Sequence, residues 1–173
     1  MLRPKKKNPR FLLLGIITII LLNSCTTEIA SETISYAGLI VKHEDGHQTS
    51  MCIPFQGDEI TGEELLNLSE IPYISDVTNP MGSRICSIDG EGCDFPAEKC
   101  FCQCGNIGPC TYWAYFVLSE GEEWVYSPVG PNMRKIHQGD VDAWVWLSKA
   151  SKDVESVKPT LPTITFDEIC SNE

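Results

Sequence analysis

Apolar and polar side chains alternate along three stretches of the chain, and this period of two residues predicts β-strands. The first stretch runs from Ile34 to Phe55 and is interrupted by Glu44-Asp45-Gly46, a sequence typical of a hairpin turn. In its first half, Ala37, Leu39 and Val41 would face one side of a sheet, and Tyr36, Gly38, Ile40 and Lys42 the other. The second stretch, from residue 81 to residue 93, contains the turn sequence DGEG near its end.

The third stretch, Cys110 to Trp146, contains all four tryptophans of the chain. It is broken at SEGE, SPVGPN and QGD, which predicts three short strands joined by turns. Alternation puts Trp113, Tyr115 and Val117 on one face and Tyr112, Ala114, Phe116 and Leu118 on the other. It likewise groups Trp124 with Tyr126, and Asp142 with Trp144 and Trp146. We expect one face to be core and the other to expose several rings, more aromatic surface than an antiparallel sheet normally leaves to water.

Two capping boxes predict helix starts. The first, Thr61-Gly62-Glu63-Glu64, precedes a short leucine-rich stretch that ends before Pro72. The second, Thr165 to Glu168, predicts a single C-terminal turn held to the domain by Phe166, Ile169 and a disulfide from Cys170. Residues 73–80 are expected to be irregular. The predicted fold class is therefore α+β, with a small, mostly antiparallel sheet and one short helix, cross-linked by disulfides.

The N-terminus has the pattern of an export signal. Residues 1–10 carry five Lys or Arg and no acid, and the mainly apolar run that follows has 12 residues, fewer than the roughly 18 of a membrane-spanning helix. Leu22-Asn23-Ser24-Cys25 resembles a bacterial lipobox. We expect residues 1–24 to be removed, Cys25 to carry lipid such as palmitate, and residues 25–33 to be a tether. The alternatives are ordinary cleavage and an uncleaved anchor. The lipid would hold domain 34–148 and tail 149–173 at the extracytoplasmic face of a cell membrane.

Charge limits the partners. The chain has a net charge of −11, and without residues 1–24 it has eight Lys or Arg against 24 Asp or Glu, a net charge of −16. Phosphate binding requires a basic patch, so we expect no nucleic-acid partner. The acidic side chains are interpreted mainly as solvating charges of an exported protein.

Cysteine chemistry indicates the same compartment. Apart from Cys25, an even number of cysteines remains, which we expect to form four disulfides outside the cell: Cys52, Cys86, Cys93, Cys100, Cys102, Cys104, Cys110 and Cys170. A zinc or copper site and a redox-active pair are the alternatives for the CFCQC cluster, but its CxC spacing differs from the CxxC knuckles of zinc sites. No metal site is predicted. His43 and His47, which flank the first hairpin turn, are interpreted as surface residues.

The run YWAYFVLSEGEEWVYSPVG followed by HQGDVDAWVW resembles the transcobalamin-like C-terminal domain family, with an aromatic strand, a W-x-Y-S step ending in a glycine and a G-D-x-x-x-W closing strand. The ITGEELL helix start also fits. The resemblance implies a small α+β fold of β-grasp type that, in vitamin carriers, closes over cobalamin beside a separate helical domain. No segment here resembles that helical domain, so a cobalamin-like ligand is one candidate among others and no cofactor is required. The implied ligand contacts are Trp113, Tyr115, Trp124, Tyr126, Ser127, Gly130 and Trp144; alternatively, these rings form the core.

We expect no enzyme. The sequence has no GxSxG, P-loop or Rossmann fingerprint, and Ser127, His137 and Asp140 are interpreted as a chance trio. The favoured function is capture of a planar small molecule, such as a corrinoid, by a lipid-anchored protein that passes it to a transporter permease. The alternatives are a scaffold or adhesive protein and a metal- or redox-handling lipoprotein that uses the cysteine cluster.

Overall fold

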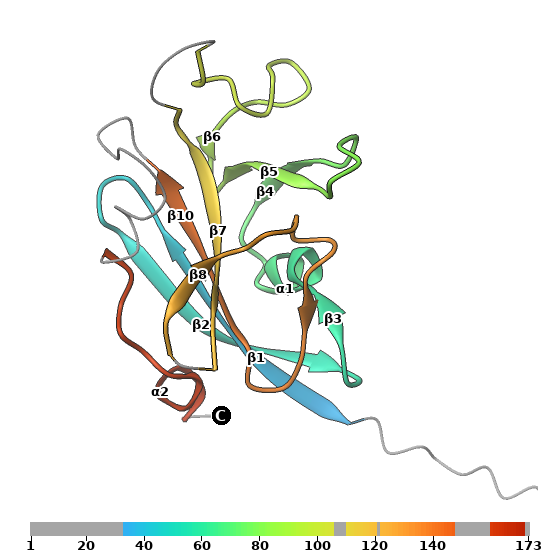
Figure 1. Cartoon of the computed structure of the whole chain (residues 1–173), viewed down its shortest axis with the longest axis vertical. Helices are drawn as coiled ribbons and strands as arrows, with labels where there is room; N and C mark the ends of the chain where they lie inside the picture. Colours follow the sequence, from blue (N-terminus) through green and yellow to red (C-terminus); the bar gives the residue numbers. More distant parts are fainter. Residues whose placement is uncertain (1–32, 106–109, 121, 148–159, 172–173) are drawn as a thin grey trace, which may run out of the picture. The chain divides into compact units, whose positions relative to one another are not determined.

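The structure is a computed structural model in which residues 33–105, 110–120, 122–147 and 160–171 are described (Figure 1). All of them belong to one compact unit, Glu32–Glu173. The predicted signal peptide, Cys25, most of the tether, the last residue of the predicted domain and residues 149–159 of the tail lie outside the described residues. Among the described helices, none has the length and apolar character needed to cross a membrane.

A five-stranded sheet forms the centre of this unit, in the order β2-β1-β10-β7-β8. The strands are β1 (Ile34–Lys42), β2 (Gln48–Gln56), β7 (Tyr112–Leu118), β8 (Trp124–Tyr126) and β10 (Val141–Leu147). The two central strands, β1 and β10, are parallel, and every other neighbouring pair is antiparallel. A helix follows the β1–β2 hairpin, and a second hairpin, β7–β8, precedes β10, as expected for a β-grasp-type sheet. The predicted α+β fold with a mostly antiparallel sheet is confirmed.

One side of the sheet, the helix face, is covered by α1 (Gly62–Leu68) and two small sheets. These are β3 (Ile60–Thr61) with β9 (Lys135–Ile136), and β4 (Tyr73–Asp76) with β5 (Arg84–Ile88) and β6 (Glu91–Gly92). The capping box at Thr61 is present as predicted, and Leu65 and Leu66 are fully buried. A helix of two turns is not stable alone, so α1 depends on this burial. The prediction that residues 73–80 are irregular is wrong for Tyr73–Asp76, because pairing with β5 makes this segment a strand.

The opposite side, the tail face, is covered by residues 160–171. Leu161, Ile164, Phe166 and Ile169 pack against Phe116, Trp124 and the alternate residues of β10. The helix α2 (Phe166–Cys170) begins at Thr165 with a complete capping box, and Cys170 forms a disulfide with Cys52 on β2. The predicted C-terminal turn, its apolar anchors and its disulfide are therefore confirmed.

Both faces of the sheet are core, and this corrects one expectation. Alternation assigns side chains to faces as predicted, but neither face leaves a plate of rings in water. All four tryptophans are buried, with Trp124 the most exposed at 8%. The reason is that the small sheets cover one face and the C-terminal tail covers the other. The alternation of apolar and polar residues within each strand does not show which distant segments pack on it.

All eight cysteines predicted to pair do so. The disulfides are Cys52–Cys170, Cys86–Cys100, Cys93–Cys102 and Cys104–Cys110. No two members of the CxC run bond to each other, as expected for neighbours at that spacing. Three of the four bonds hold the segment between β5 and β7, where regular structure is sparse.

Candidate ligand groove

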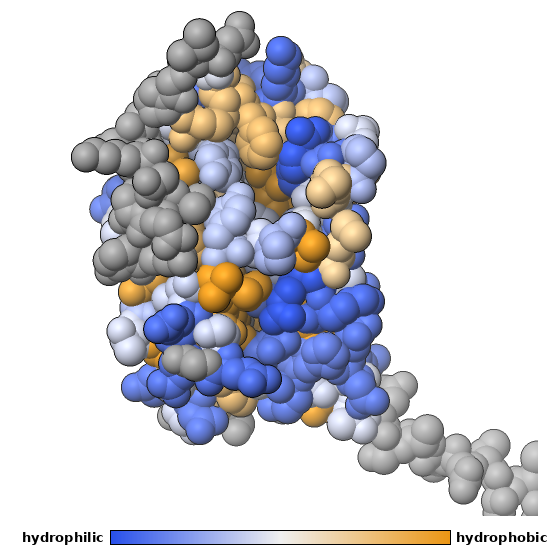
Figure 2. All heavy atoms as spheres, in the orientation of Figure 1, coloured by the Kyte–Doolittle hydropathy of each residue, from blue (hydrophilic) through white to orange (hydrophobic). Residues whose placement is uncertain are grey.

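A groove of about 270 Å³ opens at the helix face. Its walls come from the segment that enters β5 (residues 79–85), the segment that leaves β8 (residues 126–131) and aromatic residues of β7 and β10. Three of the large apolar side chains that are exposed among the described residues, Met81, Tyr126 and Val129, line it. Figure 2 shows one face of the molecule, where apolar patches lie exposed among hydrophilic residues.

The groove brings together six of the seven predicted ligand-contact residues: Trp113, Tyr115, Tyr126, Ser127, Gly130 and Trp144. They come from β7, β8, β10 and the segment after β8. Trp124 lies elsewhere. It packs in the tail face, and its indole Nε1 donates to the carbonyl of Pro162 at 2.9 Å. Trp124 is thus a structural contact between the sheet and the tail, and the structure does not place it with the other six.

Register between β7 and β10 stacks the rings beneath the groove. Tyr115 is the cross-strand partner of Trp144, and their rings are parallel within 12° with centroids 4.3 Å apart. Trp113 is the partner of Trp146, with ring centroids 5.4 Å apart. Direct cross-strand aromatic pairs stabilise a sheet. These rings therefore serve the core, while parts of Trp113, Tyr115 and Trp144 line the groove.

Gly130 has a packing role. A Cβ atom at Gly130 would lie 2.7 Å from the carbonyl oxygen of Ser83 and 2.9 Å from Cα of Gly82. The backbones of the two groove walls are therefore in contact at Gly130 and Gly82, where neither residue has a side chain. Ser127 has a local role, because its hydroxyl donates to the carbonyl of Val129 at 2.9 Å. Its own backbone N–H donates to the carbonyl of Tyr115 at 2.8 Å, which ties the wall to β7.

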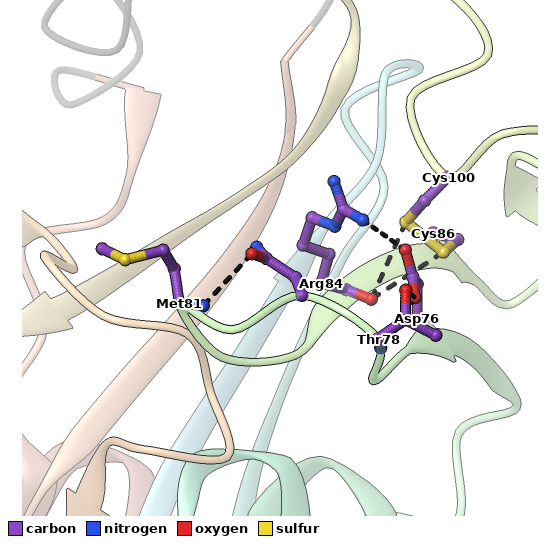
Figure 3. Close-up of polar contacts among 7 residues, drawn as sticks. Asp76, Thr78, Met81, Arg84, Cys86 and Cys100 are labelled. Atoms are coloured by element: carbon purple, nitrogen blue, oxygen red, sulfur yellow. Dashed lines mark hydrogen bonds and ion pairs between the residues drawn. A yellow bond between two sulfur atoms is a disulfide. The ribbon is translucent and has the colours of Figure 1, made fainter.

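Arg84 contributes a cation that the sequence analysis did not single out. One guanidinium nitrogen donates to the buried carboxylate of Asp76, which also accepts bonds from the hydroxyl and backbone N–H of Thr78 (Figure 3). These bonds, the Thr78 hydroxyl first, lower the pKa of Asp76. The guanidinium carbon lies 5.5 Å from the ring centre of Phe101, which also lines the groove. Asp76 and Phe101 come from opposite sides of Arg84 in the sequence, so only the fold shows this arrangement.

Two buried donors at the groove have no acceptor among the described residues. Trp144 is 2% exposed, and its indole Nε1 makes no hydrogen bond within the described part of the chain. The same holds for Nε of Arg84. Unpaired buried donors are rare and cost about 1 to 3 kcal/mol each. Both belong to residues that line one groove, although the two donor atoms themselves are buried.

A buried polar network lies behind the groove. The Tyr115 hydroxyl donates to Asp142, whose other oxygen lies 3.6 Å from a guanidinium nitrogen of Arg134. Burial raises the pKa of Asp142 to about 7, and Arg134 beside it offsets part of that effect. Burial also raises the pKa of Tyr115 well above its usual range, with a further contribution from Asp142. The network holds Tyr115 in place against α1.

The side chains considered for a cysteine metal site or a Ser-His-Asp trio are engaged in other contacts. Cys93, Glu98 and Cys102 lie close together, but the two sulfur atoms are bonded to each other, so neither is a thiolate that could bind a metal. The Ser127 hydroxyl is engaged with a backbone carbonyl. His137 is 57% exposed and lies 3.4 Å from Glu59 and 3.7 Å from Asp140.

Residues 108–173 match the model of the SCO2322-like domain family. No curated protein matches the chain. Among solved structures, the chain is similar to a Ruminococcus gnavus ATCC 29149 protein whose proposed role is metal binding, with 12% identity and a TM-score of 0.46 over 65% of this chain and 95% of that one. It is also similar to haptocorrin, a member of the transcobalamin family crystallised with Cbi, with 12% identity and a TM-score of 0.45 over 66% of this chain and 25% of haptocorrin.

Proposed function

We propose that this protein is an exported, lipid-anchored binding protein that captures a small planar ligand with an acceptor group in the groove. The observation that carries the proposal is Trp144, which is almost fully buried, lines the groove and has no partner for its indole N–H in the part of the chain that the structure describes. Stacked rings below and apolar side chains at the mouth suit a flat ligand, and an acceptor group that reached the buried donors would fix its orientation.

The size of the groove limits what it can enclose. Its volume of about 270 Å³ lies just below the range of about 300 to 1,000 Å³ that is usual for ligand pockets. A single planar ring system with a carbonyl or carboxylate would fill it. A corrinoid, which the family resemblance suggests, would place only one edge in the groove and leave the rest for a partner to cover.

The cellular setting is part of the same proposal. Lipid on Cys25 would hold the domain at the extracytoplasmic face of the membrane, and a transporter permease would receive the ligand. The strongly acidic composition argues against nucleic acid as a partner. We propose binding without catalysis, since the Ser127 hydroxyl is committed to Val129 and the eight cysteines are bonded.

Tryptophan fluorescence during titration with a panel of planar ligands, including cobalamin, cobinamide and a flavin, tests this function. The informative pair of variants is Trp144→Phe and Trp124→Phe, because each removes one indole N–H while retaining an aromatic ring. The first should weaken binding about 5- to 10-fold, as expected for one hydrogen bond. The second should leave binding unchanged, since Trp124 contacts the tail.

Two results would contradict the proposal. One is the absence of binding across the panel, with Trp144→Phe unchanged in every property. The other is an equal loss of affinity in both variants. In the first case the exposed apolar side chains near the groove, Met81 at 72% and Val129 at 36% exposure, would favour a scaffold protein that binds another protein there.

A further inference from the structure

The end of the β1–β2 hairpin places two imidazoles side by side. The backbone N–H of His43 donates to the carbonyl of His47 at 2.9 Å, so the two residues face each other across the hairpin. Gly46, with φ of +87°, closes the three-residue turn between them. Residues that face each other in an antiparallel pair project to the same side. Their ring centroids are accordingly 5.8 Å apart.

A carboxylate from a distant hairpin completes the cluster. Oε2 of Glu91, on β6, lies 2.6 Å from Nδ1 of His43. Glu91 is held at two further points, because its carbonyl accepts the indole N–H of Trp113 at 2.8 Å and its Oε1 accepts the N–H of Glu44 at 3.4 Å. The acids Glu44, Asp45 and Asp89 line the same open bowl as the two histidines and Glu91.

A divalent transition metal ion would bring the exposed His47 side chain closer to the other two ligands, since the ligand atoms of His43, His47 and Glu91 do not all lie within 4.8 Å of one another. Two imidazoles on one tetrahedral zinc ion, with Zn–N near 2.0 to 2.1 Å, have ring centres roughly 5.4 Å apart, close to the separation observed here. A cation between Nδ1 of His43 and Oε2 of Glu91 would replace the hydrogen bond between them and widen their 2.6 Å contact by about 0.8 Å, to the roughly 3.4 Å that separates two ligands of a tetrahedral zinc ion. Imidazole with carboxylate is a donor set for Zn²⁺, Cu²⁺ or Ni²⁺.

The sequence contains a sign of this site. Residues 43–47, HEDGH, have the letters of the H-E-x-x-H pattern, which on a helix puts two histidines on one zinc ion. Here a hairpin brings the histidines together by cross-strand pairing, and the third ligand comes from residue 91. The interpretation of His43 as an ordinary surface residue does not fit its surroundings. Its side chain is 14% exposed and meets the ring of Trp113 edge-on at 5.3 Å.

We propose that His43, His47 and Glu91 form a binding site for a divalent transition metal ion, with Asp45 or Asp89 or water filling the remaining positions. The site is separate from the groove, which none of these residues lines. The two features are nevertheless neighbours through Trp113, which contacts His43 and Glu91 and also lines the groove. A bound ion would fix the position of Trp113 from behind.

Isothermal titration of the untagged, disulfide-intact protein with Zn²⁺ tests the site. We expect one Zn²⁺ per chain and at least a 10-fold loss of affinity in both His47→Gln and Glu91→Gln. The third histidine of the chain provides the matched control, since His137→Gln removes an imidazole that is 57% exposed and pairs with Glu59. That variant should bind Zn²⁺ as the parent does.

A second readout uses Cu²⁺, which quenches indole fluorescence at short range. Stoichiometric Cu²⁺ should quench the parent and His137→Gln, and should quench His47→Gln much less. Far-ultraviolet circular dichroism confirms that each variant is folded. The absence of Zn²⁺ binding in the folded parent would overturn the proposal, as would an equal loss of affinity in His137→Gln. Failure of the groove proposal would be seen separately, because Trp144→Phe leaves the Zn²⁺ titration unchanged.

Discussion

The helix face and the tail face of the central sheet are built from the same kinds of side chain, yet they are completed differently. On the tail face, the indole N–H of Trp124 has an acceptor in Pro162 and a disulfide holds the covering helix. On the helix face, no described residue provides an acceptor for the indole N–H of Trp144, and the cover leaves a groove of about 270 Å³. Burial alone therefore does not distinguish the structural Trp124 from Trp144, the candidate binding residue. The two differ in whether the indole N–H has a hydrogen-bond acceptor among the described residues.

The largest effect is expected from removing the disulfide that holds the C-terminal tail on the tail face. Cys52→Ala/Cys170→Ala should lower the free energy of unfolding by about 4 kcal/mol, because this disulfide closes a loop with a sequence separation of 118. Cys104→Ala/Cys110→Ala is the matched control, with a separation of 6 and an expected loss of about 2 kcal/mol. Urea denaturation measures both. Equal losses would contradict the entropic account, and a loss of groove binding in the first pair would mean that the two faces are coupled.

A second change acts on the helix face. Gly62→Ala would place a Cβ atom 2.0 Å from the Tyr115 hydroxyl, so α1 and Tyr115 could not keep their positions. We expect the free energy of unfolding to fall by about 2 to 3 kcal/mol. In Gly62→Ala/Tyr115→Phe the clash is relieved, and part of this loss should be recovered. Chemical denaturation of the two single variants and the double variant gives the coupling, and simple additivity would show that the clash is not with the hydroxyl.

The third prediction concerns the buried network behind the groove. Because burial raises the pKa of Asp142 to about 7, the folded protein keeps a proton that the unfolded chain has released above about pH 4. This contribution to stability is fully present below the unfolded pKa and is lost as the pH rises through 7. Asp142→Asn mimics the protonated form at every pH.

We therefore expect the parent to lose on the order of 2 kcal/mol relative to Asp142→Asn between pH 5 and pH 7.5. Thermal or urea unfolding of both proteins across this range measures the difference, and comparison with the variant cancels the titration of all other groups. Parallel pH profiles would mean that Asp142 is charged in the folded protein.

The smallest effects should come from the two capping boxes. Thr61→Ala removes the cap of α1 and should cost about 1 kcal/mol. Thr165→Ala removes the cap of α2 and should cost less, about 0.5 kcal/mol, because the disulfide of Cys170 holds that helix independently. Amide hydrogen exchange at Glu64 and Glu168 locates each effect. A larger loss in Thr165→Ala would indicate that the cap, and not the disulfide, holds the tail.

Local signals predicted much of the fold. The turn at Glu44-Asp45-Gly46, the capping boxes at Thr61 and Thr165, and the facing of Trp113 with Tyr115 depend on neighbours in sequence. The pairing of strands that are far apart in the sequence could not be predicted from these local signals. The strand β4 exists because β5 lies beside it, and the two-residue strands β3 and β9 are too short to produce an alternating pattern.

The groove was predictable only in part, for the same reason. Six of its residues belong to one continuous aromatic stretch, which the family resemblance identified. Arg84 and Phe101 enter the groove from other segments, and the sequence shows nothing that assigns them to it. Glu91 reaches His43 from 48 residues away, so the cluster at the hairpin end likewise needs the fold.

The parallel pairing of β1 with β10 also affects how this protein must fold. Gly38 lies beside Val141, about 100 residues further along the chain, and neither central strand has its full set of partners until that junction forms. An N-terminal fragment thus lacks the strand that completes the centre of its sheet, and closure of so long a loop is slow. We expect nascent chains to stay unfolded until Leu147 has been synthesised, a delay that would suit the export proposed for this protein.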